Sequence, residues 1–167
     1  MQNLARWIDL FQTKLASVIK WLGLAMVIVT IVVVVLRYIF NTGAIALQES
    51  VMYMHGLLFL LGIPYGVLSN THVRVDIVYA RQTGRIQNLI NLTGHILFLL
   101  PISLFIFWTS LPYVEASWRV FEGSAEVGGL PAVFLLKTMI PVMALLLFLQ
   151  AASQIIKCIG EHRTGTS

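Results

Sequence analysis

Four long stretches of the chain contain no Asp, Glu, Lys or Arg, or carry one only near an end. A helix needs about 20 apolar residues to cross the roughly 30 Å hydrocarbon core of a bilayer. The stretches do not alternate polar and apolar residues, and backbone groups in lipid have to be satisfied within their own segment, so helices are expected rather than barrel strands. The pattern predicts four membrane-spanning helices, over about residues 21–40, 50–69, 86–114 and 132–156.

The residues before the first span follow a different pattern, in which apolar side chains recur every three or four positions. They are Leu4, Trp7, Ile8, Phe11, Leu15, Val18 and Ile19. This spacing predicts an amphipathic helix. Such a helix either lies in the membrane interface or extends the first span, and the pattern does not choose between the two. The expected organisation is an N-terminal helix over 1–20, a membrane domain over 21–158 and a short tail over 159–167.

Composition supports this fold class, an all-α membrane protein. Hydrophobic residues make up 58% of the chain and charged residues 11%, and the mean hydropathy is +0.86, whereas a soluble domain carries about 25% charged residues. The basic residues are strung between apolar runs and form no contiguous patch, so nucleic acid is not an expected partner. The single cysteine, Cys158, lacks the cysteine and histidine company of a zinc or disulfide site. We therefore expect neither a metal nor a cofactor in this chain.

Basic residues are divided unequally between the two sides of the predicted membrane domain. Eight fall on the side that holds both termini: Arg6, Lys14, Lys20, Arg74, Arg81, Arg85, Lys157 and Arg163. The other side has three basic residues and three nearby acids: Arg37, Arg119, Lys137, Glu115, Glu122 and Glu126. Because lysine and arginine concentrate in cytoplasmic loops, both termini are expected in the cytoplasm.

The first span could instead be a cleaved signal peptide, since Gly43 to Ala46 contains a small-x-small pattern. The apolar run before it is long for a signal, and about ten residues that include Arg37 separate the two. A retained span is therefore the favoured interpretation.

The loop after the second span contains the segment HVRVD, in which His72, Arg74 and Asp76 alternate with valines. Alternation suggests an extended piece, but a single strand here has nothing to pair with. A tight elbow packed against another protein suits the segment better. In a helix, His72 and Asp76 would share one face, although the sequence offers no third metal ligand nearby.

Ionisable residues well inside the spans are limited to His55 and His95. Such groups are the default markers of a transport path or proton relay. Neither histidine has an acid close in sequence, so neutral histidines hydrogen-bonded between helices are favoured. The chain therefore lacks the polar midplane expected of a complete transporter.

Small residues in the second span indicate helix packing. The stretch LLGIPYG places Gly62 and Gly66 four apart, a spacing that lets another helix approach closely, within this subunit or from a partner. Pro64 between them is expected to kink the helix.

The loop before the fourth span reads YVEASWRVFEGSAEVGGLPAVFLLK, from Tyr113 to Lys137. It is charged and aromatic, and its glycine pair permits backbone angles closed to other residues. It is expected either to dock a soluble protein or to form an interfacial cap. The candidate docking residues are Trp118, Gly128, Gly129, Leu130 and Pro131.

Several of these motifs occur in one order: RYIFNTG closing the first span, Glu49 at the head of the second, HVRVD after it, and GGLP opening the fourth. In this order and spacing the chain resembles the DctQ-type small membrane subunit of tripartite ATP-independent periplasmic (TRAP) transporters. The likeness covers roughly residues 21–156. The EASWRV and GGLP elements are most similar to the branch labelled for mannitol or chloroaromatic compounds, a label that does not identify a substrate.

The resemblance implies a subunit, not an enzyme, in the cytoplasmic membrane of a bacterium or archaeon. In such systems a periplasmic protein captures a substrate, often an organic anion, and a large membrane subunit carries it inward with sodium ions as an elevator. The small subunit would be a scaffold that binds neither substrate nor sodium. The resemblance, with the residue types, makes Arg37, Glu49, Arg74 and Asp76 candidates for contacts within the subunit or with its partner.

Two alternatives from other classes stay open. Four helices with interior histidines also describe the haem-bearing membrane anchor of a respiratory enzyme. With a rise of about 1.5 Å per residue, however, His55 and His95 differ in depth by roughly 8 Å, whereas two axial ligands of one haem should lie nearly level. Tilt could narrow that gap. The second alternative is a small helical protein that associates only with itself.

Overall fold

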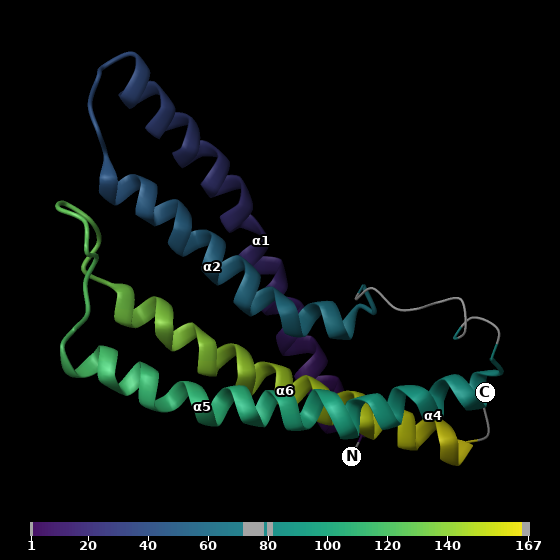
Figure 1. Cartoon of the computed structure of the whole chain (residues 1–167). Coiled ribbons are helices and arrows are strands. Elements are labelled where there is room, and N and C mark those ends of the chain that lie inside the picture. The colour runs from purple at the N-terminus through teal and green to yellow at the C-terminus, as the bar shows by residue number, and fades with distance from the viewer. Residues whose placement is uncertain (1, 72–78, 80–81, 165–167) are drawn as a thin grey trace.

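The computed structural model describes residues 2–71, 79 and 82–164, and every regular element among them is a helix (Figure 1). In chain order these are α1 (Gln2–Tyr38), α2 (Ile45–Leu68), α4 (Gly84–Gly94), the π-helix η1 (His95–Leu99), α5 (Leu100–Arg119) and α6 (Val133–Thr164). The stretches Gln2–Tyr38, Ile45–Leu68, Gly84–Arg119 and Val133–Gly160 are long and apolar enough to cross a membrane. The predicted all-helical membrane fold with four spans is confirmed. The orientation of the termini stays a prediction.

The N-terminal segment continues into the first span without a break. α1 runs for 37 residues, about 55 Å at 1.5 Å per residue, which exceeds the roughly 30 Å core of a bilayer. Of the two interpretations of the N-terminal segment, the structure has, for residues 2–20, the one in which they extend the first span.

The third span is longer than predicted. α4, η1 and α5 follow one another directly, and the helix ends at Arg119 rather than near residue 114. Glu115 and Arg119 form an i,i+4 ion pair of 2.6 Å, and Ser117 is buried, so the charges that suggested a loop instead lie on an amphipathic helix end. The assignment of Tyr113 to Arg119 to a loop is therefore wrong, and Trp118 lies on α5.

α6 is the helix on which the others assemble. It packs against α1, α2, α4, η1 and α5, and Figure 1 shows α5 beside it along much of its length. In its most apolar window 33% of the residues are buried, against 6% in each of the other spans. Its buried positions include Met143, Ala144, Leu147 and Ala151. Alanines at this interface let neighbouring backbones come close, which is how helices associate where no hydrophobic driving force acts.

The outward faces of the other spans are apolar. Val27 and Ile31 on α1 and Phe105 and Trp108 on α5 are all more than half exposed. Large contiguous apolar surfaces of this kind mark contact with membrane or with partner proteins. The fold is thus an open arrangement around α6, with polar structure concentrated at its two ends.

Candidate functional site

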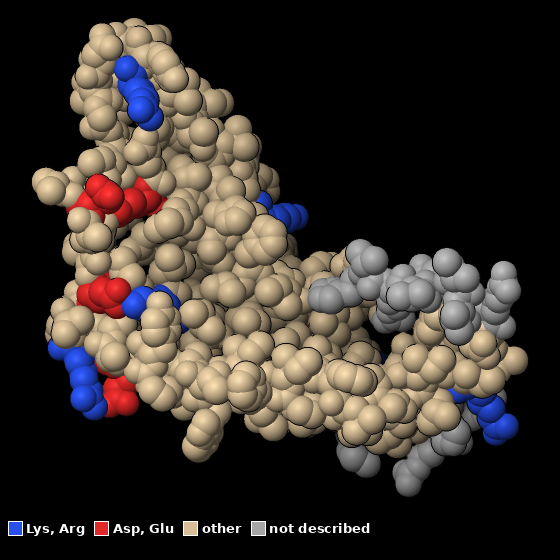
Figure 2. Space-filling model, viewed as in Figure 1, with Lys and Arg blue, Asp and Glu red and all other residues tan. Residues whose placement is uncertain are grey.

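One end of the molecule carries both the α1–α2 connection and the α5–α6 loop, which we define as residues 120–132. Acidic side chains gather at this end on the face shown in Figure 2, and the middle of that face is largely uncharged. The acids of this end are Glu49, Glu115, Glu122 and Glu126. The α5–α6 loop is therefore the natural place to look for a surface that meets a soluble partner.

Glu49, at the start of α2, holds the α5–α6 loop. The backbone N–H of Leu130 donates to Glu49 Oε2 at 2.5 Å, and the Ser124 hydroxyl donates to Glu49 Oε1. Within the loop, the N–H of Ser124 donates to the carbonyl of Leu130 at 3.1 Å. Ser124 Oγ accepts from the N–H of Glu126 at 3.0 Å. One half-buried carboxylate thus fixes both arms of a compact loop that lies 75 to 81 residues away in sequence.

Steric contacts and backbone angles explain why glycine occupies positions 123, 128 and 129 of this loop. A Cβ at Gly129 would lie 2.7 Å from Glu49 Oε1 and closer still to the Ser124 side chain, so only glycine fits beneath the carboxylate. Gly128 has φ of +82°, which side chains rarely adopt. A Cβ at Gly123 would lie 3.3 Å from the Cα of Pro131. In the sequence GGLP, the first glycine is therefore needed for the backbone turn and the second for the close approach of the Glu49 carboxylate.

An aromatic cluster joins the loop to α6. The Trp118 ring lies 4.7 Å from that of Phe134, and Phe121 lies 5.7 Å from Phe134, both edge to face. Trp118 Nε1–H donates to Thr138 Oγ1 at 2.8 Å. Phe121 follows the end of α5 with φ of 45°, a left-handed conformation that is costly for a bulky residue. The rings and the indole hydrogen bond hold that conformation in place.

An ion pair stands beside this cluster. Lys137 Nζ lies 2.5 Å from Glu122 Oε2 and 4.2 Å from the centroid of the Tyr113 ring. The hydrogen bond from Lys137 holds the pKa of Glu122 below its ordinary value. The Glu122 side chain is 36% exposed, so solvent screens the pair and its contribution to stability is small.

The predicted docking residues are therefore at one end of the molecule but differ in accessibility. Gly128 and Pro131 are exposed, whereas Gly129 and Leu130 are half-buried against Glu49. Trp118 is 41% exposed, with its ring on α6. Val127, which sequence reasoning did not single out, is 92% exposed at the tip of the loop. The accessible surface consists of residues around Val127 and Gly128, with Glu126 beside them.

The predicted contact residues are not all brought together. Glu49 holds the loop, whereas Arg37 is exposed in the last turn of α1. A Cβ at Gly62 would meet no atom within 4 Å, so none of the helices that the structure describes approaches closely there. Arg74 and Asp76 lie outside the described residues.

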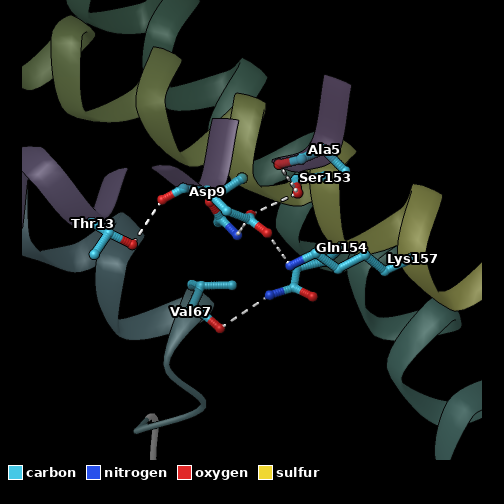
Figure 3. A network of polar contacts seen from close by, with 8 residues as sticks. Ala5, Asp9, Thr13, Val67, Ser153, Gln154 and Lys157 are labelled. Atoms are coloured by element: carbon cyan, nitrogen blue, oxygen red, sulfur yellow. Dashed lines mark hydrogen bonds and ion pairs between the residues drawn. The ribbon is translucent and has the colours of Figure 1, made fainter. Parts of the chain in front are cut away.

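A polar cluster at the opposite end was missed by sequence reasoning. Figure 3 shows Asp9 of α1 directed toward Ser153 and Lys157 of α6. Ser153 Oγ donates to Asp9 Oδ1 at 2.8 Å, Gln150 Nε2 donates to the same oxygen at 3.3 Å, and Lys157 forms an ion pair with Asp9. Gln12 Nε2 donates to the carbonyl of Leu146 at 2.9 Å. We call Asp9, Gln12, Gln150, Ser153 and Lys157 the α1–α6 polar seam.

Three residues of the seam are almost wholly buried, whereas the side chains of Asp9 and Lys157 are 20% and 35% exposed. Gln12 is 1% exposed, and Gln150 and Ser153 are 0% exposed. The sequence carries a signal for it: Asp9 and Gln12 are three apart, and Gln150, Ser153 and Lys157 are spaced three and four apart, so each set lies on one helix face. A buried polar group needs a partner. A row of polar residues on one face of an apolar helix therefore indicates that another helix carries a polar face to pair with it.

The interior histidines lie in separate surroundings. His55 on α2 lies 4.8 Å from the Phe59 ring, while His95 begins η1 and lines a polar cavity of about 280 Å³. Among residues 2–71, 79 and 82–164, no three His, Cys, Asp or Glu side chains cluster in a way that could hold a metal ion. The described polar contacts thus join helices to one another and fix a loop.

Comparison with known protein families shows what the chain is similar to. A family model described as "Tripartite ATP-independent periplasmic transporters, DctQ component" matches residues 26–161. No curated protein and no solved structure matches the chain. The matched range includes Glu49, the α5–α6 loop and the α6 half of the polar seam.

Proposed function

The chain belongs to the DctQ family of components of tripartite ATP-independent periplasmic transporters, and we propose that it serves as the stationary scaffold of a sodium-driven uptake system for an organic anion. The resemblance drawn from its sequence motifs is confirmed. The family makes the chain the small membrane subunit of such a transporter, which operates with a large membrane subunit and a binding protein. The family match over residues 26–161 is the observation that carries the proposal.

The distribution of polar groups supports a scaffold role rather than a transport path. The described side-chain hydrogen bonds that join different elements lie mainly around the α5–α6 loop at one end, and in the α1–α6 polar seam and around α4 toward the other. A substrate path near the bilayer midplane would need polar groups and interrupted helices there. Sodium and substrate are therefore assigned to the large subunit, which would move against this one.

The α5–α6 loop is proposed as the surface that meets the periplasmic protein. Both termini would then lie in the cytoplasm, as the distribution of basic residues predicts. A loop fixed by Glu49 loses less conformational entropy on binding than a free one, which favours docking. Its exposed acidic tip, with Glu126 beside Val127, would suit a basic patch on the partner.

Purification of a tagged chain from its native membrane in mild detergent tests the scaffold role. The expected result is one large polytopic membrane protein in near-equal amount, identified by mass spectrometry. Recovery of the chain alone would favour the self-associating alternative. Recovery with haem and a soluble dehydrogenase would favour the respiratory anchor, and a Soret band lost on replacing His55 or His95 would establish it.

The predicted partner contact at Arg74 can be tested in the same preparation. Arg74→Glu should reduce complex yield or uptake while substrate capture by the isolated periplasmic protein is unchanged. Wild-type yield and uptake in this variant would contradict the assignment of Arg74.

A further inference from the structure

A groove of about 460 Å³ lies between α1 and α2, toward the end of the molecule at which α1 begins and α2 ends. Ala16 on α1 and Leu58 and Gly62 on α2 form much of its apolar lining. Its polar residues are Thr13, Ser17 and Lys20 on α1 and Tyr65 on α2. The groove is therefore largely apolar and carries a cation, Lys20, on its α1 side.

The groove exists because position 62 has no side chain. A Cβ at Gly62 would meet nothing within 4 Å, whereas a Cβ at Gly56, further back in α2, would lie 2.9 Å from Leu136 Cδ1 on α6. Gly56 thus serves close helix packing, and Gly62 leaves open space. A side chain at Gly62 would enter the groove, and its Cβ would clash with no described residue.

The depth of the groove follows from the helix geometry. A Cβ at Gly23 would lie 4.0 Å from Leu58 Cδ2, so these two positions are level. α2 ends at Leu68, about 15 Å further along the axis, and Lys20 lies three residues nearer that end. The Lys20 backbone is therefore about 10 Å inside the end of α2, and its long side chain can extend to the boundary of acyl chains and headgroups.

No carboxylate of the described residues forms an ion pair with Lys20, whose ammonium lies 5.8 Å from the centroid of the Trp21 ring. Asp9, the acid on the same helix, is bound by Lys157 and Ser153. A cation at the membrane boundary is stabilised by an anion. A phospholipid has a phosphate next to its acyl chains, so its phosphate could pair with the Lys20 ammonium while an acyl chain lies in the apolar groove.

We propose that the α1–α2 groove binds one anionic phospholipid from the adjacent leaflet. Its acyl chain lies along Leu58 and over Gly62, and its phosphate meets the Lys20 ammonium and the Ser17 hydroxyl. The lipid fills a space that the described residues leave open, so it completes the packing of α1 on α2. This site is separate from the α5–α6 loop and does not depend on the docking role proposed for that loop.

Native mass spectrometry of the full chain, purified in mild detergent and titrated with phosphatidylglycerol, tests the proposal. The wild-type chain should retain one phosphatidylglycerol, and Gly62→Leu should lose it because the leucine occupies the groove. Gly94→Leu is the matched control, since Gly94 is another helical glycine whose Cβ would meet nothing within 4 Å, and it lies outside the groove. This control should retain the lipid. Circular dichroism should give wild-type helix content for both variants.

Lys20→Gln tests the charge. Its affinity for phosphatidylglycerol should fall about fivefold, with affinity for phosphatidylethanolamine little changed. Wild-type lipid retention by Gly62→Leu would overturn the site. Equal affinity of the wild-type chain for the two lipids would overturn the assignment to an anionic lipid. Loss of the large subunit from Gly62→Leu, with lipid retention unchanged, would show that a protein occupies the groove instead.

Discussion

The two ends of this subunit use polar side chains in opposite ways. At one end Glu49, half-buried, binds backbone and hydroxyl groups of the α5–α6 loop and gives that loop a fixed shape. At the other end the α1–α6 polar seam joins two helices through Gln12, Gln150 and Ser153, which are at most 1% exposed, and through the partly exposed pair of Asp9 and Lys157. Burial decides the difference, because an unpaired polar group costs little where water can reach it and much where water cannot. We therefore expect the seam to govern stability and the loop to govern recognition.

Replacing Asp9 should have the largest effect. Asp9→Leu removes the acceptor for Ser153 and Gln150 and leaves Lys157 without its ion pair. We expect a loss of about 2–3 kcal/mol in unfolding free energy, measured by thermal or denaturant unfolding in detergent. Because only the broken pair is costly, Asp9→Leu with Lys157→Met should recover part of the loss.

The exposed pair of Arg119 and Glu115 is the matched control. Its side chains are 74% and 63% exposed, so Glu115→Ala should change the unfolding free energy by less than about 0.5 kcal/mol. An effect of Glu115→Ala as large as that of Asp9→Leu would contradict the role given to burial.

Replacing Glu49 should have an intermediate and local effect. Glu49→Ala removes two hydrogen bonds to a charged acceptor and should cost about 1–2 kcal/mol. Hydrogen exchange at the Leu130 amide should accelerate by at least about tenfold. Glu126→Ala, in the same loop, should leave Leu130 exchange near wild type, since only the Glu126 backbone takes part in the loop contacts. Equal acceleration in both variants would mean that Glu49 does not hold the loop.

Gly129→Ala should disturb the same loop from beneath. The added Cβ would displace Glu49 Oε1 or Ser124, and we expect a cost of about 1 kcal/mol with faster exchange at Leu130. Gly43→Ala is its control, because a Cβ there meets nothing within 4 Å. If both alanine variants behave alike, the close fit around Gly129 has no energetic consequence.

The smallest expected effect is that of pH on the loop end. The pKa of Glu122 is lowered by Lys137, so this pair contributes at pH above the ordinary glutamate pKa and is lost as pH falls through the lowered value. The loss of this ion pair can be followed by Trp118 fluorescence. The chain used has its other tryptophans, Trp7, Trp21 and Trp108, replaced by phenylalanine. The acid transition should be absent in Glu122→Gln.

The number of spans could be predicted because uncharged runs of helical length, in a chain this apolar, fit few structures besides membrane-spanning helices. The end of the third span could not be predicted, because the charges of Glu115 and Arg119 indicate a loop whereas their spacing of four indicates a helix. In the structure the spacing prevails, and both residues lie on α5.

The site was predictable in part for a related reason. Glu49 and GGLP stood out as separate features, but nothing in the sequence states that a carboxylate at position 49 bonds to an amide at position 130. Asp9 and Ser153 are farther apart still, 144 residues in sequence. Helical spacing shows which residues share a face and not which two faces meet, so the polar seam became visible only in three dimensions.

The central position of α6 bears on how the subunit is made. α6 follows α1, α2, α4 and α5 in the chain, yet each of them packs against it. About 5–20 s of synthesis separate the ribosomal exit of α2 from that of α6, at 5–20 residues per second. During this interval α1 and α2 can pair with each other, whereas the third span lies in the membrane without α6, its main packing partner. The packing of α1, α2, α4 and α5 is therefore completed only when α6 enters the membrane, and a ribosome that stalls before α6 leaves a membrane intermediate exposed to quality-control proteases.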